Sequence, residues 1–176
     1  DFSTNVSIRN LSQEVALSVR KAQTYATSVH GVGSSVQSFP SYGIVFSTIT
    51  PSLTYDPNPK QFIVFADIAA DISSQPSKKY ESNNTCGNPG IGNECLESIS
   101  INTSDIVEGF QINGDTALRS GTLAITFRRP TADASFCYIS SGSTCDSSPI
   151  SYVKIVLKSA KGLEKKVTIW NTGQIS

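Results

Sequence analysis

The stretch TNVSIRNLSQEVALSVRKAQTYATSV, residues 4–29, carries the only strong helical period of the chain. Its apolar side chains recur every three or four positions, which places them along one stripe of a 3.6-residue helix. No Pro or Gly interrupts the stretch, and Gly31 and Gly33 follow it as helix-stop signals. We therefore expect an amphipathic helix over residues 1–30 that packs along one side. The stripe consists of Ile8, Leu11, Val15, Val19, Ala22, Ala26 and Val29.

After Phe39-Pro40 the pattern changes from helical to β. Seven short segments are rich in Val, Ile, Phe, Tyr and Thr and are separated by turn residues. The last two are joined by a short turn around Gly162, which predicts an antiparallel hairpin. The predicted fold class is α+β, with one long N-terminal helix packed on antiparallel β-sheet in a single domain over residues 1–176, of which 40–176 form the β-rich part. The predicted strands are 42–49, 61–68, 96–102, 106–112, 122–128, 151–158 and 165–170.

Two long insertions, 71–94 and 130–149, are predicted to be irregular, and each carries cysteines. Cys86 and Cys95 are close in sequence, as are Cys137 and Cys145, so we expect two local disulfides, although four cysteines allow three connectivities. Few charged and many Ser, Thr, Asn and Gly residues are typical of a β-rich extracellular surface, and disulfides fit that compartment. A zinc site is the weaker interpretation, because neither pair has the spacing of a zinc knuckle.

The formal charge of the chain is zero, so bulk electrostatics indicate no nucleic acid, anionic membrane or acidic substrate. The distribution is uneven. Residues 119–166 contain eight basic and three acidic side chains, which leaves +5 there and −5 elsewhere. Such polarity could orient subunits in an assembly or offer a cationic face to a partner, although solvated strand faces and turns would give the same pattern.

No motif of a catalytic or cofactor-binding site is present. His30 is the only histidine, and its position at the predicted helix end suggests a surface residue or a favourable contact with the last helix carbonyls. Paired carboxylates, Asp67 with Asp71 or Glu94 with Glu97, are available for glycosidase chemistry, but spacing alone is weak evidence. The loop after Asp67 lacks the dense oxygen ligands and turn glycine that calcium favours. We expect no enzyme, no cofactor and no metal.

Three phrases resemble those of type IV pilin-like proteins, in particular the GspH/FimT-like pseudopilins and minor pilins. Arg20, Ala22, Gln23, Tyr25 and Ala26 match the Arg-x-Ala-Gln-x-Tyr-Ala phrase of the family's helix. The run YGIVF, residues 42–46, is similar to its first strand, and the ending KVTIWNTGQIS, residues 166–176, to its last strand and terminal Gly-x-Ile phrase. The matches lie at both ends of the chain, and residues 51–151 agree only in pattern.

The resemblance implies a pilin-like fold and a structural subunit of a type IV pilus or a type II secretion pseudopilus, with other pilin or pseudopilin subunits as partners. In the family, a hydrophobic half-helix precedes this region, holds the protein in the inner membrane before assembly and lies in the filament core afterwards. We expect the present sequence to begin past that segment, and the isolated head to be monomeric. Val6 and Ile8 are expected to extend beyond the sheet and contact neighbouring subunits.

Two alternatives remain open at this point. Some minor pilins capture DNA, and Arg128, Arg129, Lys165 and Lys166 would form a basic patch if their strands were neighbours. However, the arginines that flank the terminal glycine motif in DNA-binding relatives are replaced here by Gln174 and Ser176. A surface adhesin is the other alternative, with the two cysteine-bearing loops as the contact regions.

Overall fold

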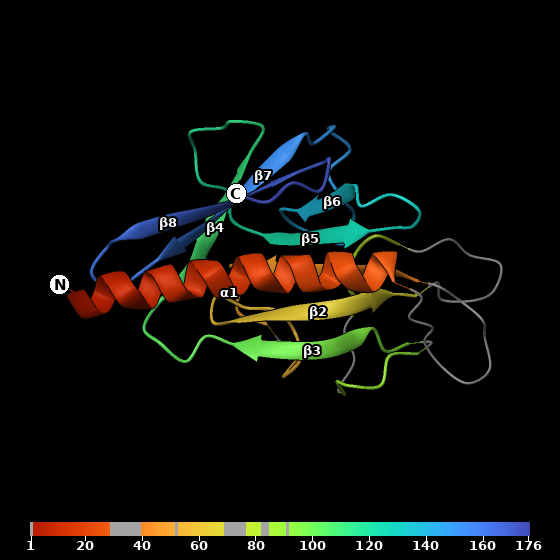
Figure 1. Ribbon diagram of the computed structural model, residues 1–176, viewed down its shortest axis with the longest axis horizontal. Coiled ribbons are helices and arrows are strands. Elements are labelled where there is room, and N and C mark those ends of the chain that lie inside the picture. Colours follow the sequence, from red (N-terminus) through yellow and green to blue (C-terminus); the bar gives the residue numbers. More distant parts are fainter. Residues whose placement is uncertain (1, 29–39, 52, 69–76, 82–84, 91) are drawn as a thin grey trace.

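The computed structural model describes residues 2–28, 40–51, 53–68, 77–81, 85–90 and 92–176. One N-terminal helix packs on two antiparallel sheets, so the expected α+β arrangement is confirmed (Figure 1). All seven predicted strands are present, with ends that differ from the predictions by at most two residues. The elements are α1 (Phe2–Thr27), β1 (Ser41–Ser47), β2 (Gln61–Asp67), β3 (Cys95–Ser100), β4 (Ile106–Ile112), β5 (Thr122–Phe127), β6 (Ala134–Ile139), β7 (Tyr152–Lys158) and β8 (Glu164–Trp170).

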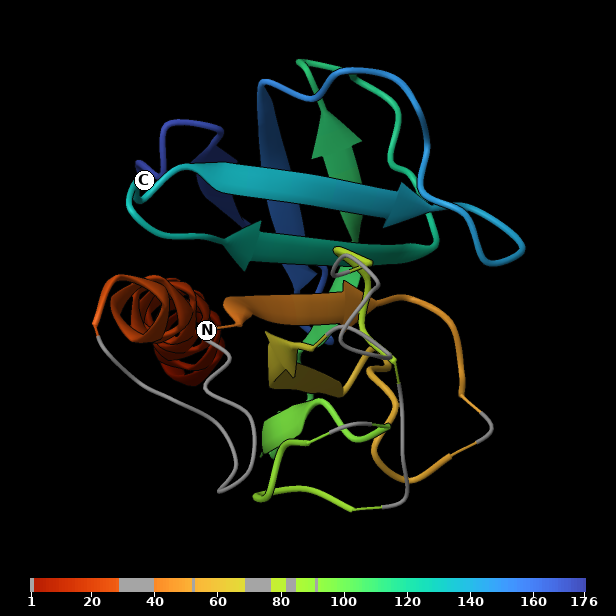
Figure 2. The ribbon, with the colours of Figure 1, turned by 90° about the vertical axis from the view of Figure 1, so that its right-hand side faces the viewer.

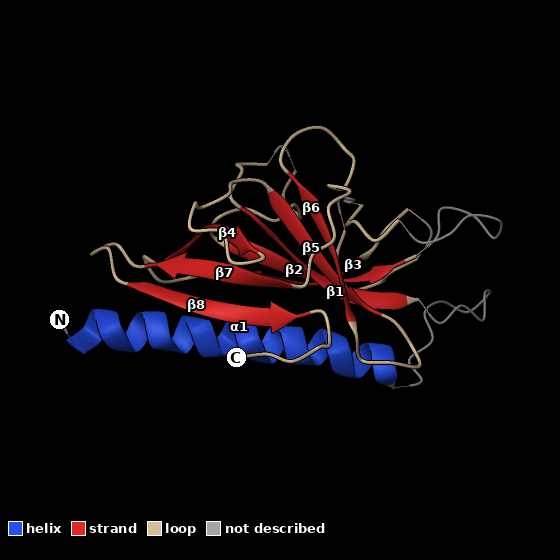
Figure 3. Ribbon diagram, turned by 90° about the horizontal axis from the view of Figure 1, so that it is seen from above, coloured by secondary structure: helices blue, strands red, loops and turns tan. Residues whose placement is uncertain are grey.

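Helix α1 lies across both sheets and contacts β1 and β5 of one sheet and β7 and β8 of the other (Figures 1 and 3). Its buried stripe follows the predicted period, because residues three and four apart share one face of a helix. Ser18, a polar residue, is buried on the same face. Val29 and His30 lie outside the described residues. The buried residues of the predicted stripe are Ile8, Leu11, Val15, Val19, Ala22 and Ala26.

One expectation about the helix start is wrong. Ile8 was expected to extend past the sheet, yet its side chain is completely buried, whereas Val6 is 39% exposed. The reason is that β7 and β8 extend along the N-terminal half of α1 and cover it (Figure 3). Ser7 is held there as well, since its hydroxyl donates a 2.5 Å hydrogen bond to the buried carboxylate of Asp105.

The larger sheet has the strand order β3-β2-β1-β5-β6 and is covered on both faces. Seen along the helix axis, α1 flanks the stacked strands on one side (Figure 2). Every residue of β1 is buried, because alternate side chains face the helix or a second, smaller core on the other face. That second core consists of Val45, Ile63, Phe65, Cys95, Ala124 and Cys137.

Both predicted disulfides are present, joining Cys86 to Cys95 and Cys137 to Cys145. Cys95 lies in β3 and Cys137 in β6, which are the two edge strands of the larger sheet. Each bond therefore attaches a neighbouring loop to an edge strand and contributes to the smaller core. From the sequence, each disulfide was expected only to close an irregular loop. In the structure, each one also fixes its loop to an edge of the sheet.

The prediction that residues 130–149 are irregular is wrong, because they contain β6. Its six residues pair in antiparallel register with β5, from Thr122 opposite Ile139 to Phe127 opposite Ala134. The short run lies between Pro, Ser and Asp residues and shows no strong β period in the sequence. Phe136, Tyr138 and Ile139 are residues that strands favour, and pairing with β5 makes the segment an edge strand of the larger sheet.

Strands β4, β7 and β8 form the smaller sheet, in that order. Val153, Ile155 and Leu157 on β7 are buried against the helix. On the opposite face Lys154 and Lys158 are partly exposed, whereas Val156 is buried. Strands β7 and β8 pair from Tyr152 opposite Trp170 to Lys158 opposite Glu164, which confirms the predicted terminal hairpin. The face toward the helix is therefore mostly buried and the other face is mostly exposed, as alternation predicts.

Candidate functional site

The three family-like phrases, which are far apart in sequence, meet at the C-terminal half of α1. The Gln23 side-chain amide donates hydrogen bonds to the carbonyl oxygens of Ala132, at 3.1 Å, and Gly173, at 3.0 Å. The Tyr25 ring packs against Tyr42 at the start of β1, with ring centroids 5.8 Å apart. The helix phrase thus contacts both the first-strand phrase and the terminal phrase.

Glycines inside these phrases allow the close packing at this junction. A Cβ atom on Gly43 would lie 2.6 Å from the Ile125 carbonyl oxygen and 2.8 Å from the Phe65 ring, so no side chain fits there without displacement. Gly173 has a φ of 82°, which favours glycine, and lies against Gln23. Beyond it the backbone turns back along β8, and Ile175 pairs with Ile169.

The outward face of α1 offers a continuous surface along the molecule. A shallow groove of about 340 Å³ follows the middle of the helix, and Leu17 within it is 66% exposed. Lys21 borders this groove and forms an ion pair with Glu97 on β3, so its position is defined by the sheet. An exposed leucine in a polar groove could contact another apolar side chain. The groove is lined by Asn10, Gln13, Glu14, Leu17, Ser18 and Lys21.

Two buried carboxyl groups, Asp67 and Glu94, lie close together at the end of β2, and sequence spacing gave no signal for this pair. The Glu94 carboxyl accepts hydrogen bonds from the backbone N–H groups of Ile68, at 3.0 Å, and Glu81, at 2.7 Å. Asp67 accepts one from Lys78, at 3.1 Å. Burial raises the pKa of Asp67 to about 6 and that of Glu94 to about 8, and each backbone donor opposes the shift.

The hydrogen bonds of this acid pair hold backbone. Each carboxyl is committed to main-chain donors of the segment between β2 and β3, and it thereby ties that segment to the sheet. Of the carboxylate pairs considered from sequence, Glu94 does not pair with Glu97, because Glu97 is bound to Lys21. The other pair, Asp67 with Asp71, involves a residue that lies outside the described part of the chain. The described residues contain no group of three or more His, Cys, Asp or Glu side chains that could hold a metal ion.

The basic residues proposed for DNA contact are not brought together. Arg128 and Arg129 follow β5 in the larger sheet, whereas Lys165 and Lys166 begin β8 in the smaller one, so their strands are not neighbours. Strand β5 points toward the C-terminal end of α1, and β8 starts at the opposite end of the molecule (Figures 1 and 3). The condition for a combined patch is therefore not met, because the two pairs belong to separate sheets.

Comparison with known proteins adds no assignment. No known family model, no curated protein and no solved structure matches this chain. Within the part of the chain that the structure describes, no helix combines the length and the apolar character needed to cross a membrane.

Proposed function

We propose that this chain is the head of a pilin-like subunit, acting by assembly into a type IV pilus or a type II secretion pseudopilus. The observation that carries the proposal is the convergence of the three phrases that resemble the family. Gln23 and Tyr25 in the helix contact the terminal phrase at Gly173 and the first-strand phrase at Tyr42. A chance resemblance of three short runs would give no reason for them to contact one another.

The shape of the helix supports the same function. Helix α1 runs the length of the molecule, and one face is buried while the other is open over its whole length (Figure 3). A subunit of a helical filament needs one such surface free for neighbours, since a repeated head-to-tail contact generates an open filament. Exposed Leu17, surrounded by polar side chains, is the residue most suited to an interface core.

The two disulfides are compatible with an oxidising compartment, and we place the head at the cell surface or in the periplasm. Under this proposal, the membrane contact before assembly is made by a hydrophobic segment that precedes the head. Filament partners are other pilin or pseudopilin subunits, and no chemistry is required of the chain.

Incorporation into filaments tests the proposal. The chain is joined in frame behind the membrane segment of a pilin, expressed in a bacterium with a functional assembly system, and detected by antibody in sheared filaments. We expect the fusion in the filament fraction, and we expect Leu17→Glu to reduce incorporation at least about ten-fold, since a charge in an interface core costs more than about 1.4 kcal/mol.

Leu53→Glu is the matched control, because Leu53 is also exposed, at 41%, but does not lie on the helix. It should be incorporated like the unmodified chain. A folded fusion that stays entirely in the membrane fraction of a competent host argues against the proposal, and equal losses for Leu17→Glu and Leu53→Glu argue against the helix face.

A further inference from the structure

The β7–β8 hairpin is strongly cationic in a chain of zero net charge. Residues 152–170 contain five lysines and one glutamate, which gives the hairpin a charge of +4. Lys158 near the turn is neutralised locally, because its ammonium group donates a 2.8 Å hydrogen bond to Glu108, and Glu164 lies opposite it. Three further lysines of the hairpin are exposed, and one of them, Lys166, donates a 3.1 Å hydrogen bond from its ammonium group to the Gln111 side chain. They are Lys161, Lys165 and Lys166.

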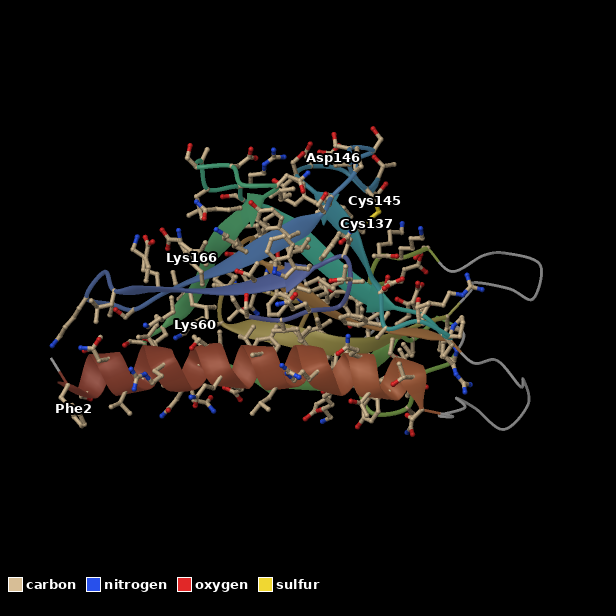
Figure 4. All side chains as sticks on the ribbon, turned by 45° about the horizontal axis from the view of Figure 1, so that its top comes forward. Phe2, Lys60, Cys137, Cys145, Asp146 and Lys166 are labelled. Atoms are coloured by element: carbon tan, nitrogen blue, oxygen red, sulfur yellow. A yellow bond between two sulfur atoms is a disulfide. The ribbon has the colours of Figure 1, made fainter. Side chains whose placement is uncertain are left out.

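Exposed apolar side chains lie at the same end of the molecule. The hairpin turn is located beside the N-terminal end of α1 (Figures 1 and 3). Figure 4 places Phe2 at that extremity and Lys166 on the neighbouring sheet, farther from the end of the molecule. Phe2 is 85% exposed, Val6 is 39% exposed, and Leu163 in the turn is 37% exposed. We name the surface at this end, formed by Phe2, Val6, Lys161, Leu163 and Lys165 and continued along β8 by Lys166, the lysine pole.

Protruding apolar residues among lysines are suited to a lipid bilayer surface. Anionic headgroups attract lysine side chains that lie near the membrane, and apolar side chains enter the boundary between headgroups and acyl chains. Lysine stems can also lie along apolar surface while the ammonium group stays among the phosphates. Phosphate groups of duplex DNA would satisfy the lysines but leave Phe2 and Leu163 in water.

We propose that the lysine pole docks the head onto anionic lipid headgroups. The position of the lysine pole next to a membrane rests on the proposed function. In that function, a hydrophobic segment precedes α1 and directs this end of the head toward the bilayer. The contact would orient the head with its long axis away from the membrane and leave the groove along α1 accessible to the next subunit. Assembly into a filament would then have to release the pole from the lipid.

Vesicle sedimentation tests this docking with the 176-residue chain alone. We expect it to bind phosphatidylglycerol-containing vesicles and not pure phosphatidylcholine vesicles, with binding lost at high salt. Neutralising the three exposed lysines together, Lys161→Gln, Lys165→Gln and Lys166→Gln, should weaken binding roughly 100-fold, since each lysine near an anionic surface contributes about five-fold. Phe2→Ser should weaken it by about ten-fold through loss of the apolar contact.

The matched control is a triple variant with the same loss of charge at the opposite end, Lys78→Gln, Lys79→Gln and Arg128→Gln. Lys78 is held at the end of β2 and Arg128 follows β5, both distant from the pole. This control should bind vesicles like the unmodified chain. All substitutions are at surface positions, and equal thermal unfolding midpoints confirm that the variants are folded.

Three results would overturn the docking proposal: no binding to anionic vesicles, equal weakening in both triple variants, or duplex DNA binding that is lost in the pole variant while vesicles are ignored. Its failure is distinguishable from failure of the proposed function. A chain that enters filaments but ignores vesicles leaves the filament function standing, and a chain that binds vesicles through the pole but never enters filaments does the reverse.

Discussion

Replacing Gln23 by alanine tests whether the helix holds the C-terminal phrase in place. The substitution removes two partly buried hydrogen bonds, at 3.1 and 3.0 Å, and leaves the carbonyl oxygens of Ala132 and Gly173 without this donor. At about 0.5–1.5 kcal/mol for each bond, we expect the free energy of unfolding to fall by about 2 kcal/mol. Urea denaturation with linear extrapolation measures this loss, and the melting temperature should fall by about 6 °C.

A local readout separates this mechanism from general destabilisation. Residues 174–176 return along β8, where the backbone N–H groups of Thr168 and Ser176 bond to each other's carbonyls at 2.7 and 2.9 Å. Without the Gln23 anchor, hydrogen exchange of these two amides should accelerate more than exchange in β1. The isosteric Gln23→Glu should cost more than alanine, because a carboxylate would face two carbonyl oxygens.

Thr24→Ala is the matched control, since Thr24 is exposed and its hydroxyl donates to the Arg20 carbonyl of its own helix, at 2.9 Å. It should change the free energy of unfolding by less than about 0.5 kcal/mol. Two findings together would refute the reasoning: a Gln23→Ala effect no larger than this control, and unchanged exchange at the chain end.

Three further outcomes are expected. Gly43→Ala should destabilise the fold by about 3 kcal/mol in urea titrations, because its Cβ would lie 2.6 Å from a carbonyl oxygen of the adjacent strand, whereas Gly90→Ala, with no atom within 4 Å of its Cβ, should be nearly neutral; equal effects would contradict the packing argument. Burial holds the pKa of Glu94 near 8, above its ordinary 4.5, so the folded state retains a proton that the unfolded chain releases. The stability of the unmodified chain relative to Glu94→Gln should therefore be greatest below about pH 4.5 and fall by a few kcal/mol as pH rises through 8; a rise over this range would reverse the assignment. Replacing Cys137 and Cys145 by alanine should cost about 2.5 kcal/mol, the value for closing so short a loop, and a change under about 0.5 kcal/mol would show that β5 pairing alone holds this edge.

The candidate site was only partly accessible from the sequence. Short-range patterns located the phrases around Gln23, Gly43 and Gly173, but nothing in them indicated that they contact one another. Asp67 and Glu94 are 27 positions apart, and their shared burial follows from the path of the chain between β2 and β3. The same reason explains why the predicted patch of Arg128, Arg129, Lys165 and Lys166 does not form. The sequence shows these residues, but it does not show that their strands belong to different sheets.

Local chemistry determined the helix and most strand positions, and it predicted two local disulfides while leaving three connectivities open. The stripe from Ile8 to Ala26 has a period that only a helix can bury on one side, and each cysteine has its partner within nine positions. Tertiary structure decided the division into two sheets, the strand at Ala134–Ile139 and the burial of Ile8 beneath β7 and β8. The physical reason is that side-chain periodicity is a property of neighbouring residues, whereas strand pairing and the meeting of buried groups depend on contacts between residues far apart in the chain.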